Sequence, residues 1–192
     1  MISSGTFHVI STELVVGSFA MAGFCFLLKT LQCFELIKSE KVSIVTDYAG
    51  HFALGFGLVA TPFAIASGIS SSPGSDLSSP LLVNKMFLSM TSVGISVAIL
   101  YSRFKFGDVI WNLKSNALVQ SISGLAASGL MLITASAGGN YSRGESLLDV
   151  LSLPYDTIFL IPFWISSLIL ITGLISTIVA LLAMNKKSAI QH

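Results

Sequence analysis

Charge-free intervals divide this chain into long apolar segments. Asp, Glu, Lys and Arg are absent from residues 14–28, 48–75, 86–102, 115–142 and 157–185. A helix needs about 20 apolar residues to cross about 30 Å of hydrocarbon, with a range of about 17–25 residues. The first interval is long enough only if the helix starts near His8 and includes Glu13. We therefore predict five membrane-spanning helices, over approximately residues 8–28, 49–70, 86–102, 116–137 and 157–184.

The composition supports this assignment. Of the 192 residues, 53% are hydrophobic and only 10% are charged, with a formal net charge of +1. Soluble domains carry about 25% charged residues, so an ordinary cytosolic enzyme, a nucleic-acid-binding protein and a disordered regulator are excluded. The sequence predicts an all-α fold: one polytopic membrane helix bundle over residues 1–192, multi-pass in the cell membrane, with lipid bound to it.

The basic residues predict the orientation. Cytoplasmic loops carry an excess of Lys and Arg. Eight basic residues fall on one side of the predicted bundle and two on the other; the eight are Lys29, Lys38, Lys41, Arg103, Lys105, Lys114, Lys186 and Lys187, and the two are Lys85 and Arg143. We therefore expect the N-terminus outside the cell and the C-terminus in the cytoplasm.

Familiar catalytic and cofactor signatures are absent from the sequence. It contains no Gly-rich phosphate loop, no His-Glu-x-x-His motif and no nucleophile elbow. His8 falls at the outer end of the first predicted span and His51 at the cytoplasmic end of the second, nearly a bilayer apart, so they cannot both ligate one haem. Cys25 lies within the first span and Cys33 at its cytoplasmic end, where a disulfide is not expected. We predict no catalytic residue and no cofactor held by this chain alone.

Glu13 is the ionisable residue that the pattern singles out. It lies five positions after His8, about 7.5 Å deeper at about 1.5 Å per residue. An ionised side chain near mid-bilayer costs at least about 2.5–3.5 kcal/mol, so Glu13 is expected to face protein or water. Lys85 enters the third span from the same outer side, which predicts a Glu13–Lys85 ion pair with Asn84 and His8 nearby.

A metal or proton site at His8 and Glu13 is the functional alternative to that structural ion pair. Two ligands five residues apart lie on different faces of a helix. A metal there would therefore need further ligands from elsewhere in the protein.

Small residues predict where the helices approach one another closely. The second span has Ala53 and Gly57, and the fourth has Gly124 and Ser128, both at small-x-x-x-small spacing.

Two polar segments connect the predicted spans. Between the fourth and fifth spans, Gly138, Gly139 and Gly144 predict flexible turns, and residues 145–153 have the spacing of a short amphipathic helix on the outer surface. Residues 104–114 predict a similar interfacial stretch on the cytoplasmic side, with Trp111 at headgroup level.

Spans one to four resemble a family of small predicted membrane proteins of unknown function found in bacteria and archaea. That family has four spans, a first helix of the His-Pro-x-x-Val-His-Phe-Pro type and a Gly-Gly loop after the fourth helix. His8 matches the first family histidine, Glu13 falls on the second, and Asn84 or Lys85 corresponds to a histidine that opens the third span. Residues 132–139 (LITASAGG) are similar to the end of the family's fourth helix, with Gly144 similar to a later loop glycine. The two replaced histidines and the added fifth span imply that any metal or haem site of the family is lost or altered here.

The leading functional hypothesis is a non-catalytic accessory subunit of a larger integral membrane oxidoreductase complex. Its partners would be other membrane protein subunits, and an archaeal copper-dependent ammonia monooxygenase is one host that we consider. The alternatives are a stand-alone electron-transfer, metal-binding or haem-binding protein with an outer-face site at His8 and Glu13, and a small transporter.

Overall fold

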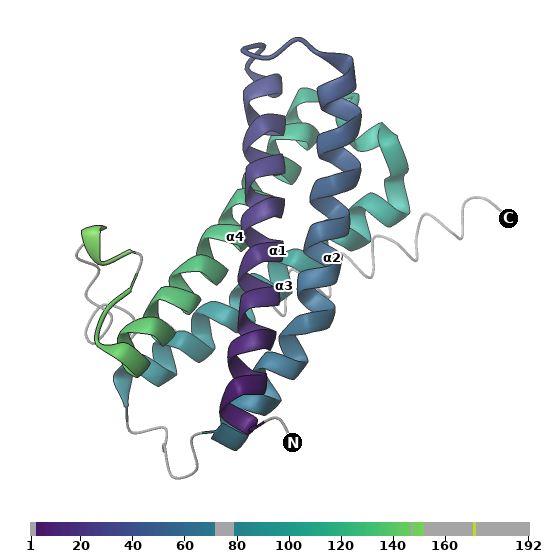
Figure 1. The fold of residues 1–192 in the computed structure, drawn as a ribbon. Helices are drawn as coiled ribbons and strands as arrows, with labels where there is room; N and C mark the ends of the chain where they lie inside the picture. The colour runs from purple at the N-terminus through teal and green to yellow at the C-terminus, as the bar shows by residue number, and fades with distance from the viewer. Residues whose placement is uncertain (1–2, 72–78, 147, 152–170, 172–192) are drawn as a thin grey trace, which may run out of the picture. The chain divides into compact units, whose positions relative to one another are not determined.

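The described part of the chain is all-α. The computed structural model describes residues 3–71, 79–146, 148–151 and 171. Four long helices run through it, with two short 3₁₀ helices after the third and fourth (Figure 1). In chain order they are α1 (Ser4–Cys33), α2 (Glu40–Ser71), α3 (Pro80–Phe106), η1 (Gly107–Trp111), α4 (Lys114–Arg143) and η2 (Asp149–Leu151).

The four long helices coincide with four of the five predicted spans. Each is long and apolar enough to cross a membrane. Each also extends beyond its predicted span, because helix continues into the polar residues at both ends. The 30 residues of α1, for example, amount to about 45 Å, longer than the hydrocarbon core. The fifth predicted span, 157–184, lies outside the described residues apart from Ile171 and belongs to a second compact unit, Asp156–His192.

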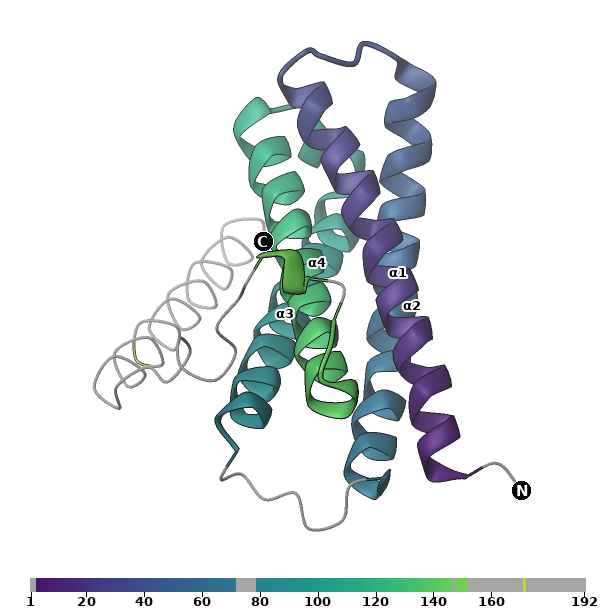
Figure 2. The same cartoon turned by 60° about the vertical axis from the view of Figure 1, so that its left-hand side comes forward.

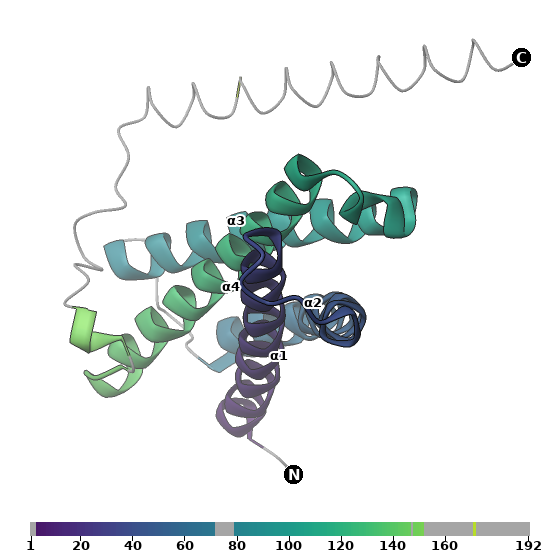
Figure 3. The ribbon, with the colours of Figure 1, turned by 90° about the horizontal axis from the view of Figure 1, so that it is seen from above.

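Within the first unit, α1 holds the central position. It packs along α2 and also against α4, which in turn packs against α3, whereas α2 and α3 touch much less. Figures 2 and 3 show this arrangement, with α1 between α2 and α4 when the bundle is seen from above. The order around the bundle is therefore α2, α1, α4, α3.

Two phenylalanines of α1 fill the centre of the bundle. Phe19 and Phe26 are fully buried, together with Leu54 of α2. Each ring is seated against a glycine of a neighbouring helix. A Cβ atom added to Gly57 would lie 2.8 Å from the Phe19 ring, and one added to Gly124 would overlap the Phe26 ring. The absence of a side chain at these glycines is therefore what admits the aromatic rings.

The other small residues singled out by the sequence lie at helix contacts as well. Ala53 packs against the main apolar core. Ser128 is buried, and its Cβ atom would be 2.9 Å from a Cβ added to Gly23 of α1.

The end of α4 differs from the sequence prediction. Gly138 and Gly139 are helical, and α4 continues to Arg143. The turn comes at Gly144, whose φ of +74° is a left-handed conformation that glycine adopts without strain. A Cβ atom on Gly138 would lie 3.0 Å from Lys85 Nζ, so this glycine provides room for a neighbouring side chain rather than a bend.

Only part of the predicted outer amphipathic helix is described, and there the chain forms the short helix η2. The Asp149 carboxylate accepts hydrogen bonds from the Ser146 backbone N–H at 2.6 Å and from the Ser146 hydroxyl at 2.5 Å. These bonds stabilise the ionised form, so they hold the pKa of Asp149 below its usual value.

The seating of Phe26 gives a stability prediction. Gly124→Ala introduces a methyl group where the Phe26 ring lies, and we expect it to lower the free energy of unfolding by about 1–3 kcal/mol, the usual cost of overpacking. Gly94→Ala is the matched control, since Gly94 is exposed on α3 and has no heavy atom within 4 Å of an added Cβ. Thermal unfolding of both variants in detergent tests this, and equal stability of the two would contradict the packing described.

Candidate functional site

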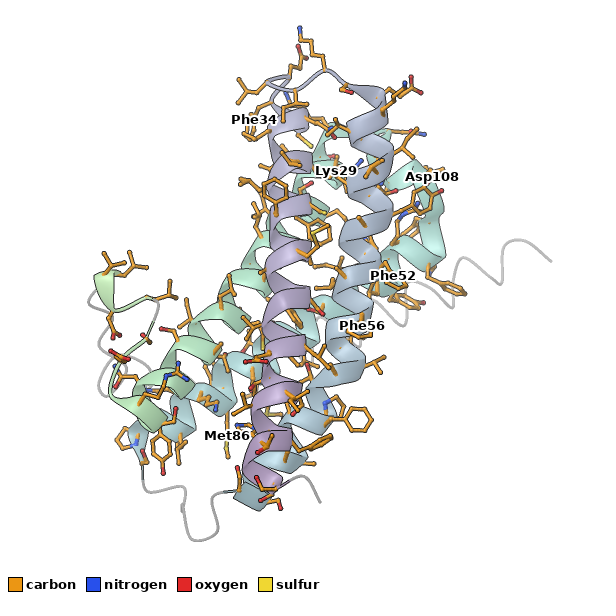
Figure 4. The ribbon with its side chains drawn as sticks, in the orientation of Figure 1. Lys29, Phe34, Phe52, Phe56, Met86 and Asp108 are labelled. Atoms are coloured by element: carbon orange, nitrogen blue, oxygen red, sulfur yellow. The ribbon has the colours of Figure 1, made fainter. Side chains whose placement is uncertain are left out.

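A polar network occupies the end of the bundle where α1 ends and α2 begins, which we call the Lys29 end. Figure 4 labels Lys29 and Asp108 there. All four long helices and η1 contribute polar side chains to it. Its members are Lys29 of α1, Ser43, Asp47 and His51 of α2, Ser102 and Arg103 of α3, Asp108 and Trp111 of η1, and Gln120 of α4.

A two-pronged ion pair joins α2 to α3. The Asp47 carboxylate accepts hydrogen bonds from Arg103 Nε at 3.2 Å and Nη2 at 2.8 Å. The Asp47 side chain is 5% exposed, so this pair is largely shielded from solvent. Arg103 Nη2 also bonds the carboxylate of Asp108, which is 78% exposed. Paired bonds of this kind fix geometry as well as adding energy.

His51 is held in one tautomer by its neighbours. Its Nδ1 lies 2.7 Å from the Asp47 backbone oxygen and 3.0 Å from the Asp47 carboxylate, which are both acceptors. Its Nε2 lies 3.0 Å from the amide nitrogen of Gln120, which is a donor. The neutral imidazole with its proton on Nδ1 satisfies both contacts.

The orientation of the Gln120 amide supports this assignment. Its oxygen accepts a hydrogen bond from the Ser102 hydroxyl at 2.7 Å, and its nitrogen donates to the Ile99 carbonyl oxygen at 3.0 Å. A flipped amide would place two oxygens against each other at Ile99. These hydrogen bonds therefore fix the orientation of the Gln120 amide, and the amide in turn fixes the tautomer of the His51 ring.

Lys29 completes the charge balance of the network. The residue is 4% exposed; its ammonium donates to the Ser43 hydroxyl at 2.8 Å and lies 4.1 Å from the centroid of the Trp111 ring. The latter distance is that of a cation–π interaction. The network thus contains two cationic side chains, Lys29 and Arg103, and two carboxylates, Asp47 and Asp108, so its formal charges balance, although Lys29 itself contacts a hydroxyl and a ring rather than a carboxylate.

The sequence analysis assigned no role to Asp47, Arg103 or Gln120. A signal was present: Asp47 and His51 are four residues apart, hence on one face of a helix. Their partners are distant in the chain, and nothing in the sequence specifies that α2 and α3 meet at this end.

The predicted site residues at the opposite end, which we call the His8 end, are not brought together. His8 Nδ1 lies 3.1 Å from the Ala64 backbone oxygen and 3.1 Å from the Ser67 hydroxyl, so His8 faces α2. Glu13 is exposed, since five residues turn a helix by about 140° relative to His8. Among the described residues, no group of three or more His, Cys, Asp and Glu side chains could hold a metal ion.

The Glu13–Lys85 ion pair is also not formed. The ion pairs within 4.0 Å in the described residues all lie at the Lys29 end and include neither Glu13 nor Lys85. Lys85 is half-buried, with its ammonium beside Gly138 of α4, while Glu13 is exposed on α1. The sequence indicates that Glu13 and Lys85 lie at the same depth along their helices. Equal depth alone does not make the two side chains face each other.

Comparison with protein-family models, with curated proteins and with solved structures finds no match. The functional argument therefore rests on the chain's own residues. In the described part of the chain they define four helices long and apolar enough to cross a membrane, with a buried polar network at one end of them.

The Asp47–Arg103 pair predicts unequal effects of two neighbouring carboxylates. Asp47→Asn leaves a shielded guanidinium without its main partner, and we expect a loss of about 3–5 kcal/mol in the free energy of unfolding. Asp108→Asn removes an exposed partner of the same arginine, with an expected loss of at most about 1 kcal/mol. Chemical denaturation in detergent measures both; similar losses would refute the central role of Asp47.

The His51 tautomer is directly observable. In protein labelled with nitrogen-15 at histidine, we expect the His51 signals of a neutral ring protonated at Nδ1. Gln120→Leu removes the donor to Nε2, so the tautomer preference should weaken in this variant. A wild-type ring protonated at Nε2 would show that the Gln120 contact is wrongly oriented.

Proposed function

We propose that this chain is a non-catalytic structural subunit of a larger integral membrane complex. The observation that carries the proposal is the closed network at the Lys29 end. His51 Nδ1 contacts Asp47 one turn back on α2, and His51 Nε2 contacts Gln120 of α4. Both carboxylate oxygens of Asp47 accept hydrogen bonds from Arg103 of α3. Such groups maintain the relative positions of helices, which is the task of a scaffold.

We further propose a five-span topology in the cell membrane, with residues 157–184 as the fifth span. The Lys29 end then lies in the cytoplasm and the His8 end outside. The excess of Lys and Arg in the segments that follow α1, α3 and residue 185 supports this orientation.

Bound lipid belongs to the proposal as well. An apolar groove of about 210 Å³ lies between α1 and α2. Its lining is almost entirely hydrocarbon, which suits an acyl chain; the residues are Phe7, Ile10, Ser11, Leu14, Phe56, Val59, Ala60 and Phe63.

As host we propose a membrane oxidoreductase, with the archaeal copper-dependent ammonia monooxygenase as the specific candidate. The alternatives were an electron-transfer, metal-binding or haem-binding protein using His8 and Glu13, and a transporter with a Glu13–Lys85 pair in its pathway. The different directions of His8 and Glu13, and the separation of Glu13 from Lys85, favour the subunit over both.

Native purification tests the proposal. We expect the 20.3 kDa chain to migrate in mild detergent with catalytic subunits in fixed stoichiometry, identified by mass spectrometry of the peak. Metal and haem assays on the same peak locate the cofactors. A chain that migrates alone or as a homo-oligomer, carrying metal or haem itself, would overturn the proposal.

A further inference from the structure

One face of α1 presents a carboxylate away from the bundle. Glu13 is exposed and makes no hydrogen bond or ion pair within the described part of the chain. Gly17, Ala20 and Phe24 follow it at intervals of four, three and four residues and are exposed too. These spacings align the four residues along one side of a helix, and we call them the Glu13 face.

The depth of Glu13 makes its exposure costly in a bilayer. In the topology proposed above, His8 and Lys29 mark the two edges of the hydrocarbon core, since the 20 residues of α1 between them amount to about 30 Å of helix. With this placement, Glu13 is five residues inside His8, about 7.5 Å below the edge. Ionisable side chains at such depth face protein or water rather than lipid.

The described residues provide no cation that pairs with this carboxylate. Neither Lys85 nor Arg143, the basic residues of the same end, pairs with Glu13 in the described structure. Residues 157–185 contain no charged side chain. We therefore expect the compensating charge on another molecule.

The shape of the Glu13 face suits a helix. Gly17 has no heavy atom within 4 Å of an added Cβ. Glycine and alanine at neighbouring positions let two membrane helices approach closely. A lipid headgroup cation would lie at the interface, about 7.5 Å above the carboxylate. Two copies of this chain meeting face to face would oppose two carboxylates, which repel each other.

We propose that the Glu13 face binds a transmembrane helix of another subunit that carries Lys or Arg opposite Glu13. The inference rests on the proposed function and names the surface through which the subunit is held. The basic side chain pairs with Glu13, and Gly17 and Ala20 allow the helix backbones to come close.

Photo-cross-linking in the intact complex tests the surface. A photoreactive residue at Gly17 should attach to a transmembrane helix with Lys or Arg within one turn of the cross-link. The same residue at Gly94, an equally open helix glycine on α3, should not reach that helix. Attachment from Gly17 to lipid, to a second copy of this chain or to a helix without a basic residue overturns the inference.

Charge exchange tests the pairing. Glu13→Lys should reduce recovery of the cross-linked subunit at least tenfold, and Glu13→Gln should reduce it less. Substituting Glu for the partner's basic residue should restore recovery with Glu13→Lys. Glu35→Gln, in the exposed segment after α1, should leave recovery unchanged. Undiminished recovery with Glu13→Lys overturns the inference.

The two proposals fail in different ways. If wild-type chain purifies alone, the subunit assignment itself fails. If the complex is intact but Gly17 contacts no basic helix, only the role of the Glu13 face fails.

Discussion

The Asp47–Arg103 ion pair is the contact on which the arrangement of the four helices depends. α2 and α3 share little other surface, and this pair joins them at the Lys29 end. Asp47 also positions His51, which meets Gln120 of α4, and Arg103 holds the start of η1 through Asp108. One carboxylate therefore connects three helices and the turn that follows α3.

At the centre of the bundle, packing depends instead on positions that have no side chain. Phe19 and Phe26 can be central only because Gly57 and Gly124 leave room for their rings. Between helices surrounded by lipid, burial of apolar surface contributes little to association. Close packing and hydrogen bonds stabilise the association instead. The bundle combines both: small residues bring the helices together, and the polar network fixes their relative orientation.

The sequence predicts elements of this fold better than contacts. Length and hydropathy locate four helices, because the cost of an unpaired charge in lipid restricts where charged residues stand. Residue type also identifies Gly57 and Gly124 as sites of close approach.

The Glu13–Lys85 pair shows the limit of prediction from sequence. The depth of a residue along a helix can be predicted from sequence, but the rotation of the helix about its axis is set by its neighbours. For the same reason Arg103, which is 56 residues from Asp47, could not be recognised as its partner. At Gly138 and Gly139, a general preference of glycine for turns gives way to local packing against Lys85 and Arg143.

The distribution of charges in the network has a consequence for biosynthesis. Lys29, Asp47 and Arg103 belong to three different helices and Asp108 to η1, and the two positive and two negative charges balance only when all four residues are present. During synthesis the Asp47 carboxylate has no arginine partner until α3 is made, because Arg103 is translated 56 residues later. The shielded position of Asp47 is therefore completed only after both α2 and α3 have been made. The order of synthesis thus makes the joining of α2 to α3 a late step in the assembly of the four helices.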